Sequence, residues 1–153
     1  MGVYNQGKAE VARGHVTTTG AYTVMLCSTG YTFNQDHTLV DDGSTSDPKS
    51  YEIGVAYTRQ TLGSVALAID NTLEKAWLDA TDPTFTAVAG TTTIGHVVIY
   101  LYSSTSTSLG TATTGDTGQV LLSQYDTTGV VTNGSNITFT LSTDGFLKFG
   151  TTT

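Results

Sequence analysis

The chain has 153 residues, and only 12% of them are charged, which is about half of the share in an ordinary soluble domain. Six Lys and Arg stand against 13 Asp and Glu, so the net charge is −7, and the basic patch that nucleic-acid binding requires is missing. No apolar run approaches the ~20 residues of a membrane span. We therefore expect one domain over residues 1–153, with no nucleic acid and no membrane among its partners.

Hydroxyl-bearing residues take the place of charge in this chain. Threonine supplies 32 residues and tyrosine eight. Branched and aromatic side chains fit a pleated surface, so this composition favours β-strands. It offers few groups for catalysis, but many short polar and flat aromatic side chains for contacts between proteins. The composition therefore indicates a structural module rather than an enzyme.

The first predicted element is a short helix over residues 5–13, which belongs to an N-terminal arm of residues 1–20. Asn5 can accept a hydrogen bond from the first free backbone N–H groups of the helix. Gly14 can end the helix in the left-handed conformation. The helix is too short to be stable alone, so we expect it to pack against other elements.

Two apolar residues, Val3 and Tyr4, precede this helix at a place where a chain end usually frays. We interpret them as an anchor on a neighbouring protein. On this interpretation, deletion of residues 1–7 weakens binding to the neighbour and leaves the melting temperature of the β-domain nearly unchanged.

Short strands with turn residues between them follow the arm. Val65, Leu67 and Ile69 alternate with small residues, which is typical of a strand that buries one face. Residues 93–102 are apolar on both faces, which predicts a central strand. The expected extended segments are residues 21–27, 51–62, 64–70, 74–80, 84–88, 93–102, 119–125, 136–141 and 146–149.

Two connections between these strands carry clear signals. Residues 103–118 are rich in Ser, Thr and Gly, which predicts a long flexible connection. Asp144-Gly145 lies between two expected strands and is a strong signal for a two-residue hairpin turn. Roughly eight or nine short strands with one N-terminal helix predict a mostly β protein, an antiparallel β-sandwich for which a jelly roll is one arrangement.

The residue types that serve in catalysis are scattered along the chain. It has no Gly-x-Ser-x-Gly nucleophile elbow and no phosphate-binding Gly-rich loop before a lysine. His15, His37 and His96 have no paired spacing, and the position of His96 in an apolar strand predicts a hydrogen-bonded core histidine. Cys27 lies in an apolar run and is expected to be a small buried hydrophobe. We expect no cofactor.

The densest acidic stretch contains Asp36, Asp41, Asp42 and Asp47. Carboxylates and backbone oxygens in a loop can bind calcium, which makes Asp36, Asp41 and Asp42 candidate ligands, although their spacing is not that of an EF-hand. The alternatives are a solvated loop, or one helical turn over residues 36–42 with Asp36 as its cap.

Aromatic residues offer a second candidate site. Sugar-binding proteins use such rings as a platform, but in a β-sandwich they also serve as core or as contacts between subunits. The candidates for this platform are Tyr31, Phe33, Tyr51, Tyr57 and Trp77.

Stretches along nearly the whole chain resemble, in their order, a family of small virion proteins of tailed bacteriophages. Members of that family are head decoration, head fibre or minor tail proteins, and the family supplies no catalytic residues. The stretches that carry the resemblance are Val3-Tyr4-Asn5, Tyr22-Thr23-Val24-Met25-Leu26, Tyr31-Thr32-Phe33-Asn34-Gln35-Asp36-His37 with Val40-Asp41-Asp42, Tyr57-Thr58-Arg59-Gln60-Thr61-Leu62, Asp79-Ala80 with Phe85, Ile94-Gly95-His96-Val97-Val98-Ile99-Tyr100, and Thr132-Asn133-Gly134 with Phe146-Leu147-Lys148.

The resemblance implies a capsid decoration (cement) protein, which binds the outer surface of the head and stabilises it. Its partners would be the major capsid protein and copies of itself, with a homotrimer as the expected assembly. Val3, Tyr4, Tyr31 and Phe33 are the candidate contacts with the capsid or with other subunits. The expected location is the outer capsid surface of a virion that assembles in the bacterial host cytoplasm. The alternative is a minor tail or tail-tip protein that binds a host receptor or a carbohydrate.

Overall fold

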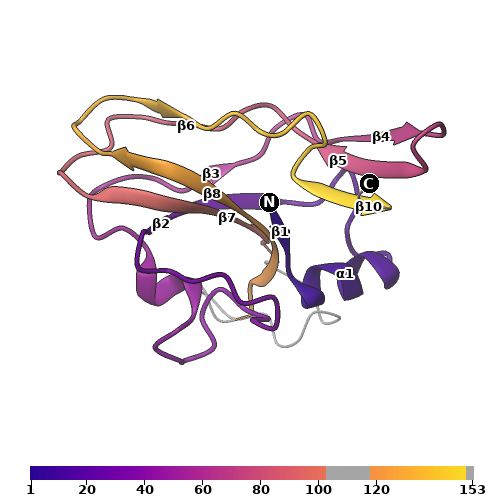
Figure 1. The fold of residues 1–153 in the computed structure, drawn as a ribbon, viewed down its shortest axis with the longest axis horizontal. Coiled ribbons are helices and arrows are strands. Elements are labelled where there is room, and N and C mark those ends of the chain that lie inside the picture. Colours follow the sequence, from indigo (N-terminus) through magenta and orange to yellow (C-terminus); the bar gives the residue numbers. More distant parts are fainter. Residues whose placement is uncertain (103–117, 151–153) are drawn as a thin grey trace.

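The structure, a computed structural model, describes residues 1–102 and 118–150 (Figure 1). The predicted flexible connection, residues 103–118, lies outside the described residues except for Gly118. The described elements are, in chain order, β1 (Gly2–Val3), α1 (Asn5–Ala12), β2 (Tyr22–Ser28), the 3-10 helix η1 (Pro48–Tyr51), β3 (Gln60–Thr61), β4 (Ala66–Asp70), β5 (Lys75–Asp79), β6 (Thr84–Phe85), β7 (Thr93–Leu101), β8 (Val120–Val131), β9 (Ile137–Thr138) and β10 (Leu147–Gly150).

Among the described residues, the strands form three sheets in which all pairings are antiparallel. The largest, which we call the central sheet, has the order β1-β8-β7-β2-β3. The second, which we call the hairpin sheet, has the order β10-β5-β4, and β6 pairs with β9 in the third. The predicted fold class, mostly β and antiparallel with one short helix near the N-terminus, is confirmed.

The central sheet has an apolar core on each face. In β2, Val24 and Leu26 belong to the first core, whereas Met25 and Cys27 belong to the second. The first core lies between the central sheet and a layer made by the hairpin sheet and the β6–β9 pair, which gives the sandwich-like arrangement seen in Figure 1. The loop that follows β2 and leads to η1 covers the second core.

The prediction of a central strand over residues 93–102 is confirmed by β7, which pairs with β8 on one side and β2 on the other. Val98 and Tyr100 share the face of the second core, but a bulge at Gly95 turns Ile94 towards the first core. A Cβ on Gly95 would lie 2.5 Å from the Cα of Thr29. This close approach is possible only with glycine.

The predicted helix is present as α1, which packs against β8. Its start differs from the prediction, because Asn5 is the first helical residue and Tyr4 takes the cap position without a side-chain hydrogen bond. The Asn5 amide instead donates to Oδ1 of Asp36 over 2.8 Å. Gly14 has a φ of 76°, which confirms the prediction that this glycine ends the helix in the left-handed conformation.

Two turn predictions are wrong. Residues 36–42 form no helical turn; the 3-10 helix η1 comes later, and the carboxylate of Asp47 accepts a hydrogen bond of 2.8 Å from the backbone N–H of Ser50 at its start. Asp144-Gly145 joins no hairpin, since β9 pairs with β6 and β10 pairs with β5. Long-range pairing therefore overrides the local turn signal.

Candidate functional site

The structure gathers three of the predicted contact residues into one cluster beside β1, largely inside the chain. Tyr4 and Tyr31 are 0% and 2% exposed, and their hydroxyls share a hydrogen bond of 2.7 Å. The Phe33 ring lies against Tyr4 with its centroid 4.9 Å away, and burial raises the pKa of Tyr31 to about 12. Tyr4 and Tyr31 are thus core residues, whereas Val3 and Phe33 are half-buried and keep a surface that another protein can touch.

The N-terminal arm is built into the same core. Val3 pairs with Ser123 of β8, and the backbone N–H of Tyr4 donates to the carbonyl of Leu122 over 3.0 Å. The Cα of Gly7 is so near Leu122 that a Cβ would lie 2.8 Å from the Leu122 oxygen. We therefore correct the expectation that residues 1–7 can be deleted without loss of stability.

The carboxylates of the candidate calcium ligands accept hydrogen bonds from the backbone of their own loop or from α1. Oδ1 of Asp41 accepts a hydrogen bond from the N–H of Gly43, and Oδ1 of Asp42 accepts one from Ser44. Hydrogen bonds from Ser44 lower the pKa of Asp42. Within residues 1–102 and 118–150, no group of three His, Cys, Asp or Glu residues is placed to hold a metal.

The five candidate platform aromatics do not share one surface. Tyr31 lies 5.9 Å from Tyr51, centroid to centroid, in the second core. Tyr57 packs on Phe85 in the first core, with 5.9 Å between the ring centroids. Trp77 belongs to the hairpin sheet. No observation on the described residues therefore favours a sugar-binding platform.

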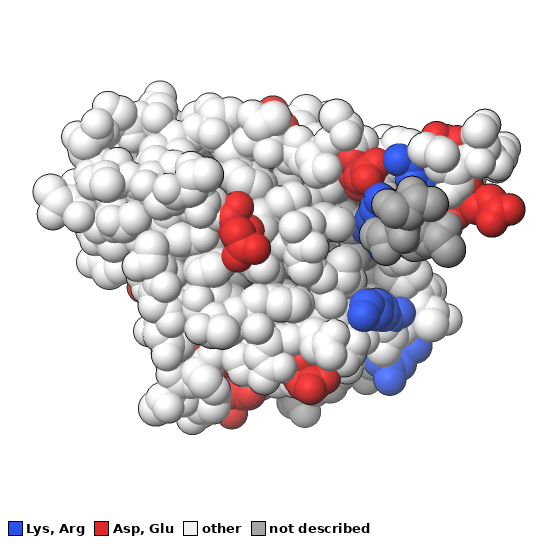
Figure 2. Space-filling model, in the orientation of Figure 1, with Lys and Arg blue, Asp and Glu red and all other residues white. Residues whose placement is uncertain are grey.

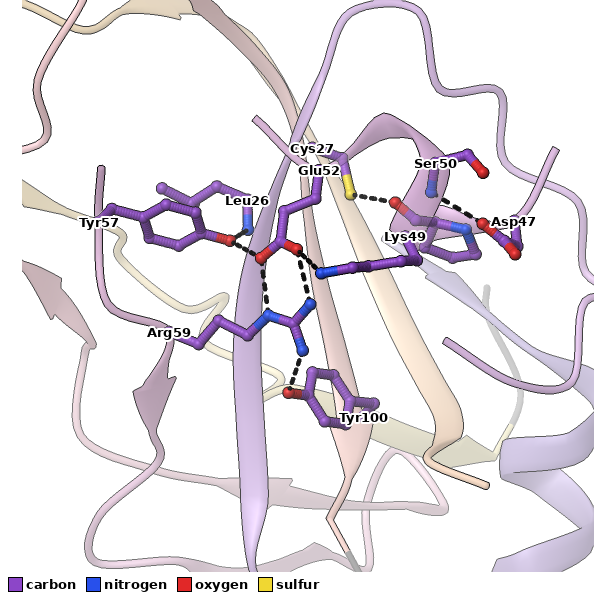
Figure 3. Close-up of polar contacts among 10 residues, drawn as sticks. Leu26, Cys27, Asp47, Lys49, Ser50, Glu52, Tyr57, Arg59 and Tyr100 are labelled. Atoms are coloured by element: carbon purple, nitrogen blue, oxygen red, sulfur yellow. Dashed lines mark hydrogen bonds and ion pairs between the residues drawn. The ribbon is translucent and has the colours of Figure 1, made fainter. Parts of the chain in front are cut away.

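A polar network that the sequence did not predict closes the edge of the central sheet beside β2 (Figure 3). Arg59 donates two hydrogen bonds of 2.7 Å to the two carboxylate oxygens of Glu52. Tyr57 and Lys49 each donate one of 2.6 Å to the same carboxylate. Burial raises the pKa of Glu52, but these donors outweigh burial and lower the pKa to about 2. The bidentate pair fixes the loop after η1.

The single cysteine is buried below this network, as predicted. Its thiol donates to the carbonyl of Pro48 over 3.4 Å, and burial raises its pKa, so it is an unreactive thiol. His96 makes polar contacts as predicted, since its Nδ1 lies 3.0 Å from Asp126 and 3.3 Å from the amide oxygen of Gln124, but it is half-buried rather than a core residue.

The hairpin sheet has an apolar face that the described part of the chain, residues 1–102 and 118–150, only partly covers. Strand register places Leu67, Leu78 and Leu147 in one row across β4, β5 and β10. Leu147 is 0% and Leu78 4% exposed, but Leu67 on the edge strand is 54% exposed, and Ile69 on the same face is 64% exposed. The alternation around Leu67 predicted a strand correctly, but its expected burial is wrong, because β4 lies at the edge of the sheet.

Two grooves follow this apolar face. The groove nearer the N-terminal arm has a volume of about 260 Å³, and its apolar lining is Val11, Val16, Leu67, Leu78 and Phe149. The groove nearer the β4–β5 turn has a volume of about 310 Å³, and its apolar lining is Ile69, Ala76 and Phe149. Because Phe149 lines both, we treat them as two ends of one channel, which we call the hairpin channel.

Charges of opposite sign lie at the two ends of the hairpin channel. Asp70 and Glu74 stand at the β4–β5 turn and line the outer groove together with Lys75, whose ammonium pairs with Asp144. Lys8 and Arg13 belong to α1 or follow it directly, and both are exposed. Figure 2 shows acidic side chains at the projecting hairpin with basic side chains beside them at its base, further basic side chains over the position of α1, and a largely uncharged surface elsewhere on this side.

No family model, curated protein or solved structure matches this chain. In the part of the chain that the structure describes, no helix has the length and apolar character needed to cross a membrane. Among the surfaces of the described residues, the hairpin channel is the most developed. Sequence reasoning missed it because its two walls are at least 49 residues apart in the chain, from Thr18 to Leu67.

Proposed function

We propose that this chain is a structural protein of a tailed-bacteriophage virion, a decoration protein that binds the outer surface of the head and stabilises it. The observation that carries this proposal is the partly covered apolar face of the hairpin sheet, on which Leu67 and Ile69 are more than half exposed. Exposed apolar faces of this kind are typical of contacts between proteins. The resemblance of the ordered sequence stretches to phage virion proteins supplies the biological setting.

Low surface charge supports the same proposal. Burial of a charge without a partner is expensive, whereas neutral hydroxyl and apolar surface is buried at lower cost. Only 12% of the residues are charged. A decoration protein repeats one weak contact many times over a lattice, and linked copies gain strength by avidity. The proposed partners are the major capsid protein and further copies of this chain, with a homotrimer as the proposed assembly.

The N-terminal edge is the proposed contact with the major capsid protein. Val3 and Phe33 are half-buried there, and a Cβ on Gly2 would lie 2.7 Å from the Phe33 ring. The strand β1 and this ring are therefore one rigid surface, which the buried Tyr4 supports from below. A rigid surface loses little conformational entropy when it binds.

The test uses phage heads that lack this protein. Purified protein is added, bound protein is measured by co-sedimentation, and the decorated heads are imaged by electron cryo-microscopy. We expect saturable binding, density on the outer shell, and a higher melting temperature of the heads. Absence of saturable binding contradicts the proposal, and density in intact virions that is confined to the tail assigns the chain to the tail instead.

A further inference from the structure

We infer that the hairpin channel receives the β4–β5 turn of a second copy of this chain, in a head-to-tail contact. The inference rests on the self-association in the proposed function and names the surface that performs it. It does not depend on head binding, which is measured separately. The partner is thus a second copy, and the contact joins the β4–β5 turn of one copy to the arm end of the channel, lined by Val11, Val16 and Leu67, on the other.

The chain's own segments are poorly suited to fill the channel. The β4–β5 turn lies at the far end of the same face, and five residue pairs between β4 and β5 hold it there. The residues outside the description, 103–117 and 151–153, carry one large apolar side chain, Leu109. An occupant with several apolar side chains on a rigid element is therefore expected from outside the chain.

The β4–β5 turn of a second copy has the required apolar side chains. Ile69 is 64% and Leu73 51% exposed, and both project from a hairpin whose turn is fixed by hydrogen bonds from the N–H groups of Thr72 and Leu73 to the carboxylate of Asp70. The arm end of the channel offers half-buried Val16 as a complementary wall. Rigid apolar knobs that enter a pocket are the usual energetic centre of an interface.

Charge complementarity supports a second copy over an unrelated apolar partner. The turn carries the acids Asp70 and Glu74 beside Lys75, whose ammonium pairs with Asp144. The helix α1, which supplies Val11 to the arm end of the channel, carries the exposed base Lys8. Lys8 lies three residues before the channel residue Val11 on α1, which places both on neighbouring positions of one helix face. Docking of the turn on this end therefore sets acid against base. This matters for a chain of net charge −7, whose copies otherwise repel each other.

The first test is sedimentation of the purified full chain over a range of concentrations. We expect association of the wild type, and a dissociation constant raised at least about tenfold by Ile69→Gln. Thr18→Trp, which fills the arm end of the channel from an exposed position, is expected to have the same effect. The matched control is Val131→Gln, because Val131 is a 56% exposed apolar residue of β8 that does not line the channel, and this variant should leave association unchanged.

The second test exchanges the charges. Glu74→Lys and Lys8→Glu each place like charges at the contact, so each variant alone should associate more weakly than the wild type. In an equimolar mixture the two variants attract each other again, and we expect mixed complexes. Arg13 is left unchanged because it pairs with the buried Glu10. Unchanged melting temperatures of the variants show that folding is intact.

Two results overturn the inference. One is a wild type that stays monomeric up to about 1 mM, a concentration at which even weak contacts are populated. The other is association that Ile69→Gln and Val131→Gln weaken equally. Failure of the proposed function appears in a different measurement, as absence of saturable binding to heads, so the two failures are distinguishable.

Discussion

The central sheet and the hairpin sheet are both built from apolar strands, but they differ in how much of that surface is covered. In β7, the neighbours Val97 and Val98 point to opposite faces and are 1% and 0% exposed. In β4, Leu67 and Ile69 point to one face and are both more than half exposed. An apolar pattern therefore identifies a strand, whereas its position in the layers decides its burial. Where an apolar edge strand stays uncovered, a partner is the expected reason.

The largest loss of stability is expected from substitutions in the second core, on the face of the central sheet that contains Tyr4. Tyr4→Ala removes a fully buried ring from the second core and is expected to lower the free energy of unfolding by about 4 kcal/mol. Tyr4→Phe, which loses only the hydrogen bond to Tyr31, should cost about 1 kcal/mol. Urea denaturation measures both. If deletion of residues 1–7 leaves the unfolding midpoint unchanged, the arm is not part of the core. The contrast between a fully covered central sheet and a partly exposed hairpin sheet would then be wrong.

The next largest loss of stability is expected at low pH, from the network around Glu52 at the edge of the central sheet. The pKa of Glu52 is lowered from 4.5 to about 2 in the folded chain, so its contribution is present above pH 4.5 and is lost as the pH falls towards 2. This shift corresponds to about 3 kcal/mol of stability. We expect the free energy of unfolding to fall over that window. Denaturation at several pH values measures it.

Glu52→Gln is the control for this pH dependence. It keeps the size of the side chain but removes the charge that Arg59 and Lys49 bind. The variant should be less stable than the wild type at pH 7, and the part of the acid dependence that belongs to Glu52 should disappear. An identical acid profile in both proteins would mean that this network does not stabilise the edge.

The smallest effect is expected on the exposed face of the hairpin sheet. Leu67→Ala should change the free energy of unfolding of the isolated chain by less than about 1 kcal/mol, because the side chain is 54% exposed. Leu147→Ala, in the same row but fully buried, should cost about 3 kcal/mol. Calorimetry of dilute samples measures the loss of stability in each of the two variants. Equal losses would show that the face is covered within the single chain.

Much of the fold could be predicted from local pattern. The strands β2 and β7 lie close to where apolar runs placed them, and Gly14 ends α1 with the expected positive φ. The strand order could not be predicted, because it depends on pairings between distant segments, such as β1 with β8 and β10 with β5. The failed hairpin at Asp144-Gly145 has the same cause.

The candidate sites were harder to predict because residue type says little about burial. Tyr4 and Tyr31 were chosen as contacts for their aromatic character, and the fold uses that character for its own core. Conversely, Leu67 was expected in the core and is exposed. The network around Glu52 left no signal, because residues 51–62 were expected to be extended, whereas only β3 (Gln60–Thr61) is a strand there and the donors Tyr57 and Arg59 come from the loop before it.

The central claim, that the exposed face of the hairpin sheet is a contact surface, is tested most directly by its accessibility in the associated protein. Cys27 is the only cysteine and is buried with a raised pKa, so a thiol introduced by Ile69→Cys can be labelled selectively with a maleimide. The control is Val131→Cys, at an exposed position on β8. We predict that labelling at position 69 slows as the protein concentration rises, while labelling at position 131 stays constant. Equal labelling at both positions in fully associated protein would contradict the claim.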